Sequence, residues 1–212
     1  MIDYNVISTG SRGNAVIINS NILLDCGVSF KALEPHYKGL GLVLLTHIHS
    51  DHFNKSCIKR LAAERPMLRF GCMHWLVGEL VNIDVKNIDV YNFGETVDYG
   101  SFAVIPIPLT HDVPQCGYKI HFSDGKKLIY ATDTNNMNGI NAPNYDLYMI
   151  EANYVTAEIE EKIRQKRSNG EYAYEMQVIK NHLSKEKADD FIYRNIGTTG
   201  QYVYLHCHED SE

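Results

Sequence analysis

The sequence predicts an α+β fold in which two β-sheets pack face to face and the helices lie outside them. Short apolar runs bounded by turn residues recur along the chain, whereas helical spacing is sparser and falls between groups of these runs. The chain has 212 residues, of which 44% are hydrophobic and 22% charged, and it shows no internal repeat. We therefore expect residues 1–212 to form one domain with a substantial core.

The expected strands are short segments rich in branched and aromatic apolar residues, and we expect many of them to pair antiparallel. Several end in a histidine or an aspartate, so polar side chains would gather where strands end and loops begin. In chain order the expected strands are Tyr4–Ser8, Ala15–Asn19, Ile22–Asp25, Leu42–Thr46, Ile88–Phe93, Phe102–Ile107, Gly117–Phe122, Leu128–Thr132, Asp146–Glu151 and Tyr202–His206.

Four segments have helical spacing of apolar residues. The first would be capped by Asn54 and stopped by Pro66, and the last would follow Ser184 as its cap. In contrast, Arg164–Gln177 has the composition of a loop. The apolar positions that mark the four helices are Ile58, Leu61 and Ala62; Trp75, Leu76, Leu80 and Val81; Ile159 and Ile163; and Ala188, Phe191 and Ile192.

Composition excludes some classes of protein. The net charge of −6 gives no overall attraction to polyanions, although a local basic patch can still exist. No basic N-terminal stretch precedes a long apolar run, and no segment has the apolar length of a membrane span, so we expect a cytoplasmic protein without membrane contact. The five cysteines are odd in number and lack CxxC spacing, which argues against a disulfide framework; we expect most of them to be buried.

The most informative segment is the histidine-rich run that follows the apolar residues 42–45. It holds His47, His49, Asp51 and His52 within six residues. A strand that ends in a tight loop directs alternate side chains to one side, so His47 and His49 can converge on one ion while Asp51 and His52 point at a second. Imidazole nitrogens and a carboxylate suit zinc or a similar divalent metal. The alternative is a surface loop that is rich in histidine by chance.

Three further candidate ligands lie at the ends of other expected strands. His111 follows a strand that ends in prolines, Asp133 follows residues 128–132, and His206 follows residues 202–205. A carboxylate in the position of Asp133 can bridge two ions with its two oxygens. Taken singly, each residue is more often an ordinary loop residue, but together with the histidine-rich run they complete two ligand sets.

With these residues the chain resembles the metallo-β-lactamase superfamily over nearly its whole length, which implies an αββα sandwich and one hydrolase domain. The run from His47 to His52 matches the family's HxHxDH motif. The resemblance implies two divalent ions, Zn²⁺ first and Mn²⁺ as the other choice. It assigns the first ion to His47, His49 and His111, the second to Asp51, His52 and His206, and the bridge to Asp133. Asp25 matches a family aspartate that holds the ligand loop in place.

Shorter motifs resemble the phosphodiesterase branch of this superfamily, which includes WalJ/YycJ-like exonucleases and ribonuclease Z. They are the segments 8–14, 24–27, 150–153 and 181–184. The resemblance implies that His182 contacts the scissile phosphate, supported by Glu151, while Asp51 serves both as ligand and in catalysis. A carboxylate that hydrogen-bonds an imidazole raises its pKa and orients it. The alternative is that His182 merely flanks the helix capped by Ser184.

Departures from the family bear on the substrate. Phe53-Asn54 stands where many lactamases and thioesterases carry Gly-Gly, which disfavours the alternative of a thioesterase or lactonase. A non-catalytic metal-binding module is a further alternative, but no ligand is lost. His206-Cys207-His208 replaces the His-Leu-Ser of the branch, so His208 can compete with His206 as a ligand.

Two substrate classes stay open: DNA or RNA, as in WalJ-like exonucleases, and cyclic nucleotides, as in the anti-Pycsar phosphodiesterases of phages, which this chain also resembles. Arg12, in a glycine-rich loop, is the best candidate for a phosphate contact. The basic run 162–167 is more typical of a solvated helix face, and Tyr172 and Tyr174 could stack on a base but more often pack locally. A homodimer is implied by the resemblance alone.

Overall fold

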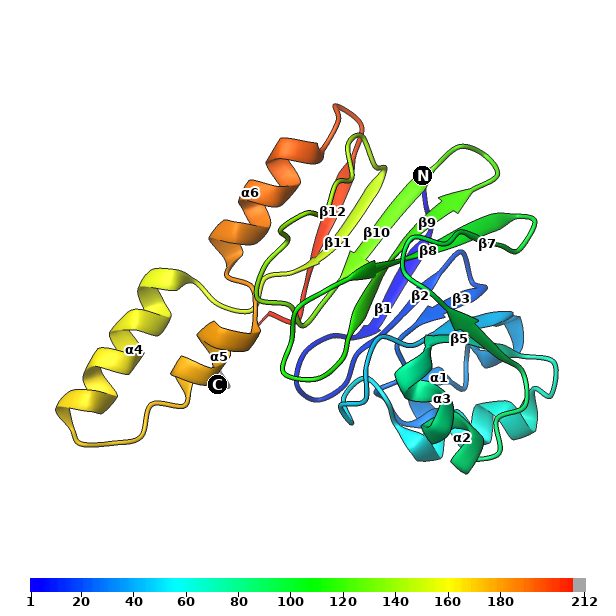
Figure 1. Ribbon diagram of the computed structural model, residues 1–212, viewed down its shortest axis with the longest axis horizontal. Helices are drawn as coiled ribbons and strands as arrows, with labels where there is room; N and C mark the ends of the chain where they lie inside the picture. The colour runs from blue at the N-terminus through cyan, green and yellow to red at the C-terminus, as the bar shows by residue number, and fades with distance from the viewer. Residues whose placement is uncertain (208–212) are drawn as a thin grey trace. The chain divides into compact units, whose positions relative to one another are not determined.

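A computed structural model describes residues 1–207 of the chain, which form two compact units, one from Met1 to Val97 and one from Asp98 onward. We refer to them as the first and the second unit, and each is built on one six-stranded sheet (Figure 1). That residues 1–212 make one hydrolase domain stays a prediction. Among residues 1–207, no helix combines the length and the apolar character needed to cross a membrane.

The sheet of the first unit is mixed, with strand order β1-β2-β3-β4-β5-β6. The strands β1 to β3 pair antiparallel, and β3 to β6 pair parallel. The strands are β1 (Tyr4–Ser8), β2 (Ala15–Ile18), β3 (Ile22–Leu24), β4 (Leu42–Leu44), β5 (Arg69–Met73) and β6 (Ile88–Tyr91). The helical elements are α1 (Phe30–Leu33), the 3-10 turn Tyr37–Gly39, α2 (Lys55–Glu64) and α3 (His74–Asn82).

The helix α2 forms where the sequence predicts one, because its cap and its apolar face agree. The side chain of Asn54 accepts a hydrogen bond from the backbone nitrogen of Cys57 at 3.1 Å, which satisfies one of the first backbone donors of the helix. Ile58 and Leu61 are fully buried in the core that α1, α2 and α3 share with the sheet. This packing anchors the residues just before α2, which include the histidine-rich run.

The sheet of the second unit is also mixed, with strand order β12-β11-β10-β9-β8-β7. The pairs β8 with β9 and β9 with β10 are antiparallel, whereas β10, β11 and β12 run parallel. Its strands are β7 (Val97–Asp98), β8 (Phe102–Pro108), β9 (Cys116–Phe122), β10 (Lys127–Ala131), β11 (Leu147–Glu151) and β12 (Gln201–Leu205), and its helices are α4 (Thr156–Ser168), α5 (Glu175–Asn181) and α6 (Lys185–Asn195).

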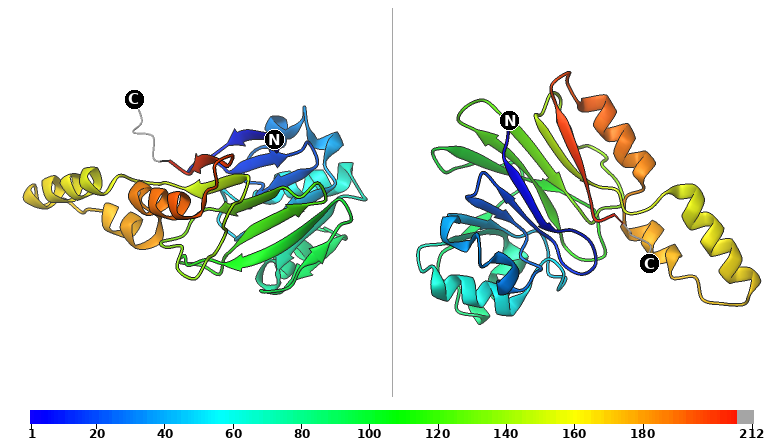
Figure 2. Two further views of the ribbon diagram at one scale, coloured as in Figure 1. Left: turned by 90° about the horizontal axis from the view of Figure 1, so that it is seen from above. Right: turned by 180° about the vertical axis from the view of Figure 1, so that it is seen from behind.

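The helix α6 covers part of this sheet, and two views show it alongside β11 and β12 (Figures 1 and 2). Ser184 caps it by accepting a hydrogen bond from the backbone nitrogen of Lys187. Its buried face, Ala188, Phe191 and Ile192, packs in one core with residues of β10 and β11. The predicted fourth helix is therefore confirmed together with its cap.

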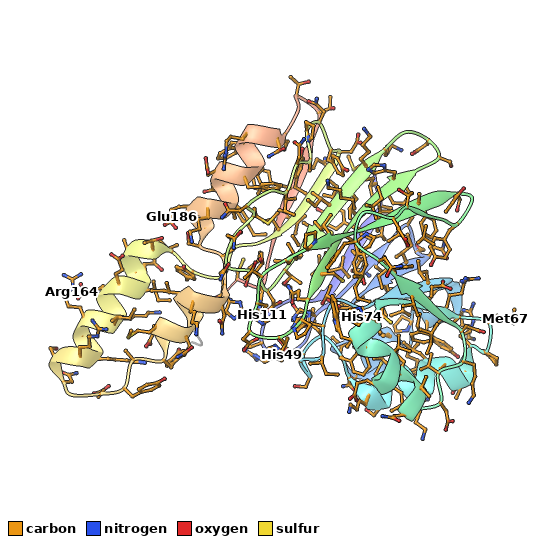
Figure 3. The ribbon with its side chains drawn as sticks, viewed as in Figure 1. His49, Met67, His74, His111, Arg164 and Glu186 are labelled. Atoms are coloured by element: carbon orange, nitrogen blue, oxygen red, sulfur yellow. The ribbon has the colours of Figure 1, made fainter. Side chains whose placement is uncertain are left out.

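The helices α4 and α5 form a hairpin that extends from the second unit beyond the edge of its sheet (Figures 1 and 2). The predicted loop Arg164–Gln177 is wrong at both ends, because residues 164–168 continue α4 and residues 175–177 begin α5. Polar contacts replace the missing apolar pattern: Lys166 Nζ lies 2.5 Å from Glu175 Oε1 and 4.2 Å from the ring centre of Tyr174. Arg164 extends from the outer side of α4 (Figure 3).

Other expectations hold in part. Four of the five cysteines are buried, as expected, and Cys207 is exposed. The prediction of many antiparallel strands is right for the beginning of the first sheet and the middle of the second, but both sheets end in parallel strands. Strand β5 was not expected. Gly71 suits its centre because a Cβ there would collide with the hydroxyl group of Tyr91.

Candidate metal and phosphodiester site

The histidine-rich run lies in the loop between β4 and α2 and forms a compact group in the first unit. The rings of His47 and His52 are buried, and their centres are 4.3 Å apart. The ring of His49 is partly exposed and stands edge-on to His47 at 4.8 Å. We call His47, His49, Asp51 and His52 the first-unit cluster. The structure therefore brings together the four ligands predicted from the HxHxDH run.

Asp25 organises this cluster from the end of β3. One of its oxygens accepts hydrogen bonds from the backbone nitrogen and the hydroxyl group of Thr46, each at 2.9 Å. Its other oxygen lies 2.8 Å from His52 Nδ1, and both side chains are fully buried. A carboxylate oxygen accepts a hydrogen bond only from a protonated nitrogen, so Nδ1 of His52 carries the proton. In the neutral ring, Nε2 then carries a lone pair. A nitrogen in that state can bind a metal, and here it lies 2.8 Å from Nδ2 of Asn14, whose amide can donate to it.

Thr46 extends the same control to His47. Its hydroxyl oxygen lies 2.9 Å from His47 Nδ1, while its hydroxyl hydrogen is directed to Asp25. The oxygen therefore accepts a hydrogen bond from Nδ1, which leaves the lone pair of His47 on Nε2. One buried carboxylate thus sets the tautomers of two candidate ligands.

Asn14 is a site residue that the sequence analysis did not single out, although it lies within the quoted segment 8–14. Its Nδ2 is 2.8 Å from His52 Nε2 and 3.0 Å from the backbone oxygen of Gly10, and its backbone nitrogen donates to the backbone oxygen of Asp51 at 2.6 Å. A Cβ at Gly27 would overlap that same oxygen of Asp51. The glycine-rich loop is therefore packed tightly against the ligand loop. Its Arg12 is exposed, and a phosphate contact by Arg12 stays a prediction.

A second group of chemically active side chains lies in the second unit. Asp133 and Glu151 come from the ends of β10 and β11, His182 follows α5, and His206 follows β12. One ligand atom from each of the four side chains lies within 4.8 Å of the ligand atoms of the other three. We call these four residues the second-unit cluster. Parallel strands β10, β11 and β12 end at the same edge of the sheet, which explains why residues so far apart in the sequence meet there.

Short contacts join the members of this cluster. His182 Nδ1 lies 2.6 Å from Glu151 Oε1, and His206 Nδ1 lies 2.9 Å from Asp133 Oδ1. The other oxygen of Glu151 accepts hydrogen bonds from the backbone nitrogens of Thr134 at 2.8 Å and Leu183 at 3.3 Å. The carboxylate of Glu151 is thus fixed on both sides while it holds the ring of His182.

The carboxylates control the protonation of both rings. Burial lowers the pKa of His182, but the hydrogen bond and the charge of Glu151 raise it more, so this pKa lies above its ordinary value. Burial likewise lowers the pKa of His206, and the charge of Asp133, with Glu151 as a second carboxylate, overcomes that effect and raises the pKa to about 10. The side chain of His182 is 18% exposed, so one edge of this ring meets solvent.

The turn that carries Asp133 is held by Gln115, which the sequence analysis also missed. The amide nitrogen of Gln115 donates to the backbone oxygens of Thr132 and, at 2.7 Å, of Asp133. The hydroxyl group of Thr132 donates to the carboxylate of Asp133 at 2.8 Å. No local pattern in the sequence links Gln115 to a turn so far along the chain.

His111 lies on the loop that follows β8 (Figure 3). Its Nδ1 donates to the backbone oxygen of Asn181 at 3.1 Å, and its ring centre is 5.3 Å from that of His182. Its Nε2 lies 3.1 Å from the carboxylate of Asp112. Burial lowers the pKa of His111, which favours the neutral ring that a metal requires.

The donor atoms in each unit fit a divalent cation. The first-unit cluster offers His47 and His52 with their tautomers already set, and the second-unit cluster offers two carboxylates and two imidazoles within reach of one another, of which an imidazole must release its proton to bind a metal. Geometry alone makes Glu151 and His182 as available to a metal as Asp133 and His206. The predicted competitor His208 lies outside the described residues.

Comparison with known proteins shows what the chain is similar to. Residues 20–178 match the model of the β-lactamase superfamily domain. Exodeoxyribonuclease YycJ of Bacillus anthracis is 25% identical over 147 residues, which are 63% of this chain and 54% of that protein. The match thus spans about half the length of YycJ.

Solved structures are similar over almost the entire chain. The metallo-β-lactamase fold protein YhfI from Bacillus subtilis has a TM-score of 0.76 at 15% identity, covering 99% of this chain and 88% of that one. The short form of human tRNase Z has a TM-score of 0.67 at 16% identity, covering 98% and 92% of the two chains. These likenesses confirm the predicted fold class, in which mixed sheets are flanked by helices. Since the family model matches most of the chain, the protein belongs to the β-lactamase superfamily.

Proposed function

We propose that this protein is a binuclear metal-dependent phosphodiesterase that hydrolyses phosphodiester bonds in a nucleotide or a nucleic acid. The observation that carries the proposal is the contact of 2.6 Å between His182 Nδ1 and Glu151 Oε1. Such a pair can also orient a metal ligand, as Asp25 orients His52, but the pKa of His182 lies above its ordinary value, and the departure of an alkoxide from phosphorus needs an acid or a positive charge beside the leaving oxygen. The metal ligands keep the assignment that the family resemblance implies.

The chain's own residues divide the work as follows. Asp25 and Thr46 hold the rings of His47 and His52 so that each presents Nε2. Glu151 orients His182, whose Nε2 then holds a proton toward the phosphate. Asp51 acts as ligand and in catalysis. Two divalent cations, with Zn²⁺ as the first choice, supply an activated water and stabilise charge on the phosphate oxygens when bound.

Similarity to Exodeoxyribonuclease YycJ supports hydrolysis of phosphodiesters as the reaction. It does not choose between nucleic acid and a cyclic nucleotide as the substrate, because the match spans about half of that protein. A location in the cytoplasm and assembly into a homodimer are further parts of the proposal, and they rest on the sequence and on the resemblance.

Hydrolysis by the purified protein loaded with Zn²⁺ or Mn²⁺ tests the proposal. The substrates are cyclic mononucleotides, single-stranded DNA and RNA, bis(p-nitrophenyl) phosphate, a thioester and a β-lactam. We expect cleavage of phosphodiesters only. Hydrolysis of the thioester or the lactam at a comparable rate, or failure to cleave any phosphodiester with either metal, would refute it.

A further inference from the structure

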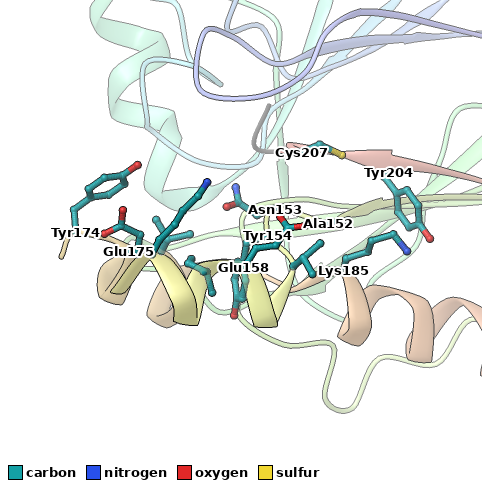
Figure 4. A pocket seen from close by; sticks show the side chains of 13 residues that line it. Ala152, Asn153, Tyr154, Glu158, Tyr174, Glu175, Lys185, Tyr204 and Cys207 are labelled. Carbon is teal, nitrogen blue, oxygen red and sulfur yellow. The ribbon is translucent and has the colours of Figure 1, made fainter. Parts of the chain in front are cut away.

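The second unit contains a pocket next to the second-unit cluster. It has a volume of about 220 Å³ and lies among the residues that follow β11, the α4–α5 hairpin and the end of β12 (Figure 4). Ala152 and Asn153 in its wall directly follow Glu151, and Cys207 directly follows His206. Asn153 also hydrogen-bonds to the backbone of Leu183 and His206. A ligand in this pocket therefore lies beside the segments that carry the chemistry.

A buried carboxylate in the pocket wall points to a ligand. Glu175 is 4% exposed, and its Oε1 lies 2.5 Å from Lys166 Nζ. No side chain or backbone group of residues 1–207 donates a hydrogen bond to its Oε2. Burial raises the pKa of Glu175, but the hydrogen bonds from Lys166 and from the backbone N–H of Glu175 itself lower it by more, so the group is a carboxylate. An ionised oxygen that is buried without a donor is costly, and a bound N–H group removes that cost.

The other walls of the pocket suit a flat aromatic ring. Tyr154, Tyr174 and Tyr204 line it, together with the apolar side chains of Ile159 and Val178. Figure 4 shows Tyr174 and Glu175 at one end and Tyr204 at the other. Pockets for whole drug-sized ligands measure roughly 300–1,000 Å³, so this one fits a fragment such as one ring system. Aromatic side chains bind nucleobases by stacking.

We propose that this pocket is a nucleobase subsite, in which Glu175 Oε2 accepts a hydrogen bond from the ring N–H of the base. The inference rests on the proposed function, because the base belongs to the nucleotide whose phosphodiester is cleaved. Guanine suits the carboxylate best. Its N1–H and N2–H donors are adjacent, whereas adenine and cytosine place a lone pair beside their amino group and uracil flanks its N–H with two carbonyl oxygens.

Nucleoside binding tests the subsite apart from catalysis. The δ1-methyl signal of Ile159 in the NMR spectrum of the full chain reports occupancy of the pocket, and that of Ile58, buried in the first unit, serves as the reference. We expect guanosine to shift the Ile159 signal with a lower Kd than adenosine, cytidine or uridine. Absence of any Ile159 shift with all four nucleosides overturns the inference.

Two variants and a matched control identify the contact. Glu175→Gln should weaken guanosine binding about tenfold or more, because a hydrogen bond to a charged group is lost. Val178→Trp fills the pocket and should abolish the Ile159 shift. Glu171→Gln, an exposed change in the same hairpin, should leave the Kd within about twofold, as surface substitutions usually do. If Glu175→Gln or Val178→Trp binds guanosine as the unchanged chain does, the subsite is wrong.

A base-free substrate separates this inference from the proposed function. Bis(p-nitrophenyl) phosphate carries no nucleobase, so its hydrolysis by the unchanged chain reports the reaction alone. Hydrolysis without nucleoside binding overturns the subsite and leaves the phosphodiesterase. The opposite result is that the chain binds nucleosides, Glu175→Gln weakens this binding, and no phosphodiester is hydrolysed. That result overturns the proposed phosphodiesterase function and leaves the subsite standing.

Discussion

Three residues of the site hold the backbone in the left-handed region that favours glycine. Asp25, Asp133 and His206 have φ angles of 56°, 49° and 49°, and each stands just after a strand. A side chain in this region costs about 1 kcal/mol, which the surrounding structure must supply. The strain turns each side chain off the line of its strand and into a cluster.

The strain at His206 can be measured by a pair of substitutions. His206→Gly should be more stable than His206→Ala by about 1 kcal/mol, because both lose the same side-chain contacts and only glycine relaxes the backbone. Urea unfolding of the metal-free variants gives the difference. At Tyr202, an exposed strand position, the order should reverse. The same order at both positions would show that the φ angle of His206 carries no cost.

We predict two divalent metal ions per chain. Loss of the bridging ligand should release more ions than loss of a ligand that contacts only one ion. Asp133→Ala should lose both ions, because it is the assigned bridge, whereas His206→Ala should lose chiefly one. Elemental analysis of protein dialysed against zinc measures both. Exposed His74 is the matched control, and His74→Ala should keep both ions. A single ion in the unchanged chain under saturating zinc and manganese would refute the binuclear assignment.

His182→Ala should lower turnover of an unactivated phosphodiester by about 10²–10⁴-fold, the usual effect of a positioned acid. The metal content of this variant should stay unchanged, because we propose that His182 contacts the phosphate and not a metal ion. Glu151→Gln should act through the same ring, so the double variant should cost little more than the worse single one. A substrate with a p-nitrophenolate leaving group should recover much of the loss. Metal loss in His182→Ala would make the residue a ligand instead.

The residues of the site were predictable where chemistry is concentrated in the sequence. His47, His49, Asp51 and His52 are close neighbours, and the resemblance supplied roles for the rest. Thr46, Asn14 and Gln115 were not predicted, because each acts through hydrogen bonds to backbone or side chains that only the folded chain brings near. The sequence around an ordinary polar residue does not indicate which distant group its side chain will hydrogen-bond.

At the scale of elements, the helices α2, α3, α4 and α6 were predictable from apolar residues at helical spacing, whereas the end of α4 and the helix α5 were not. Asn54 and Ser184 mark the starts of α2 and α6 correctly. The hairpin lacks a continuous apolar face, and contacts such as that between Lys166 and Glu175 hold it, so its sequence looks like a loop. Strand β5 was hidden by its central Gly71, which interrupts the run of apolar residues.

A carboxylate links the starts of α4 and α6. Glu186 accepts hydrogen bonds from the backbone nitrogen and the hydroxyl group of Thr156 at 3.0 and 2.7 Å, and it lies where the two helices begin (Figure 3). Burial raises the pKa of Glu186, but these hydrogen bonds, with others from its own backbone N–H and from the side chain of Ser184, lower it by more, to about 2. Because the pKa is lower in the folded chain, the ionised group stabilises the fold above the unfolded pKa of about 4.3.

This stabilisation should disappear as the pH falls from about 4 toward about 2. Glu186→Gln should therefore reduce the free energy of unfolding at pH 7, and the reduction should shrink at pH 3. Urea unfolding of both proteins at the two pH values measures it. The exposed Glu160 on α4 provides a control, since Glu160→Gln should have little effect at either pH. An equal loss at pH 7 and pH 3 would exclude a role for the charge.

At the scale of the whole molecule, salt dependence should distinguish the two substrate classes. Neutralising several phosphates releases counterions, so binding of a nucleic acid should weaken steeply as salt rises, whereas binding of a single nucleotide should change little. The net charge of −6 favours the smaller substrate. We therefore expect a nearly flat KM for a cyclic mononucleotide between low and physiological salt, and no tight binding of single-stranded DNA. Steep salt dependence with tight DNA binding would favour the nuclease.

The α4–α5 hairpin lies between Glu151 and His182 in the chain, and backbone hydrogen bonds join its two ends. Asn153 donates to the backbone oxygen of Leu183 at 2.9 Å, and Lys185 donates to that of Tyr154 at 2.7 Å. These hydrogen bonds fix the two ends of the hairpin beside the pair of Glu151 and His182. Glu151 and His182 therefore lie at the base of the hairpin, beside these hydrogen bonds, so a substitution far out on the hairpin need not displace either side chain.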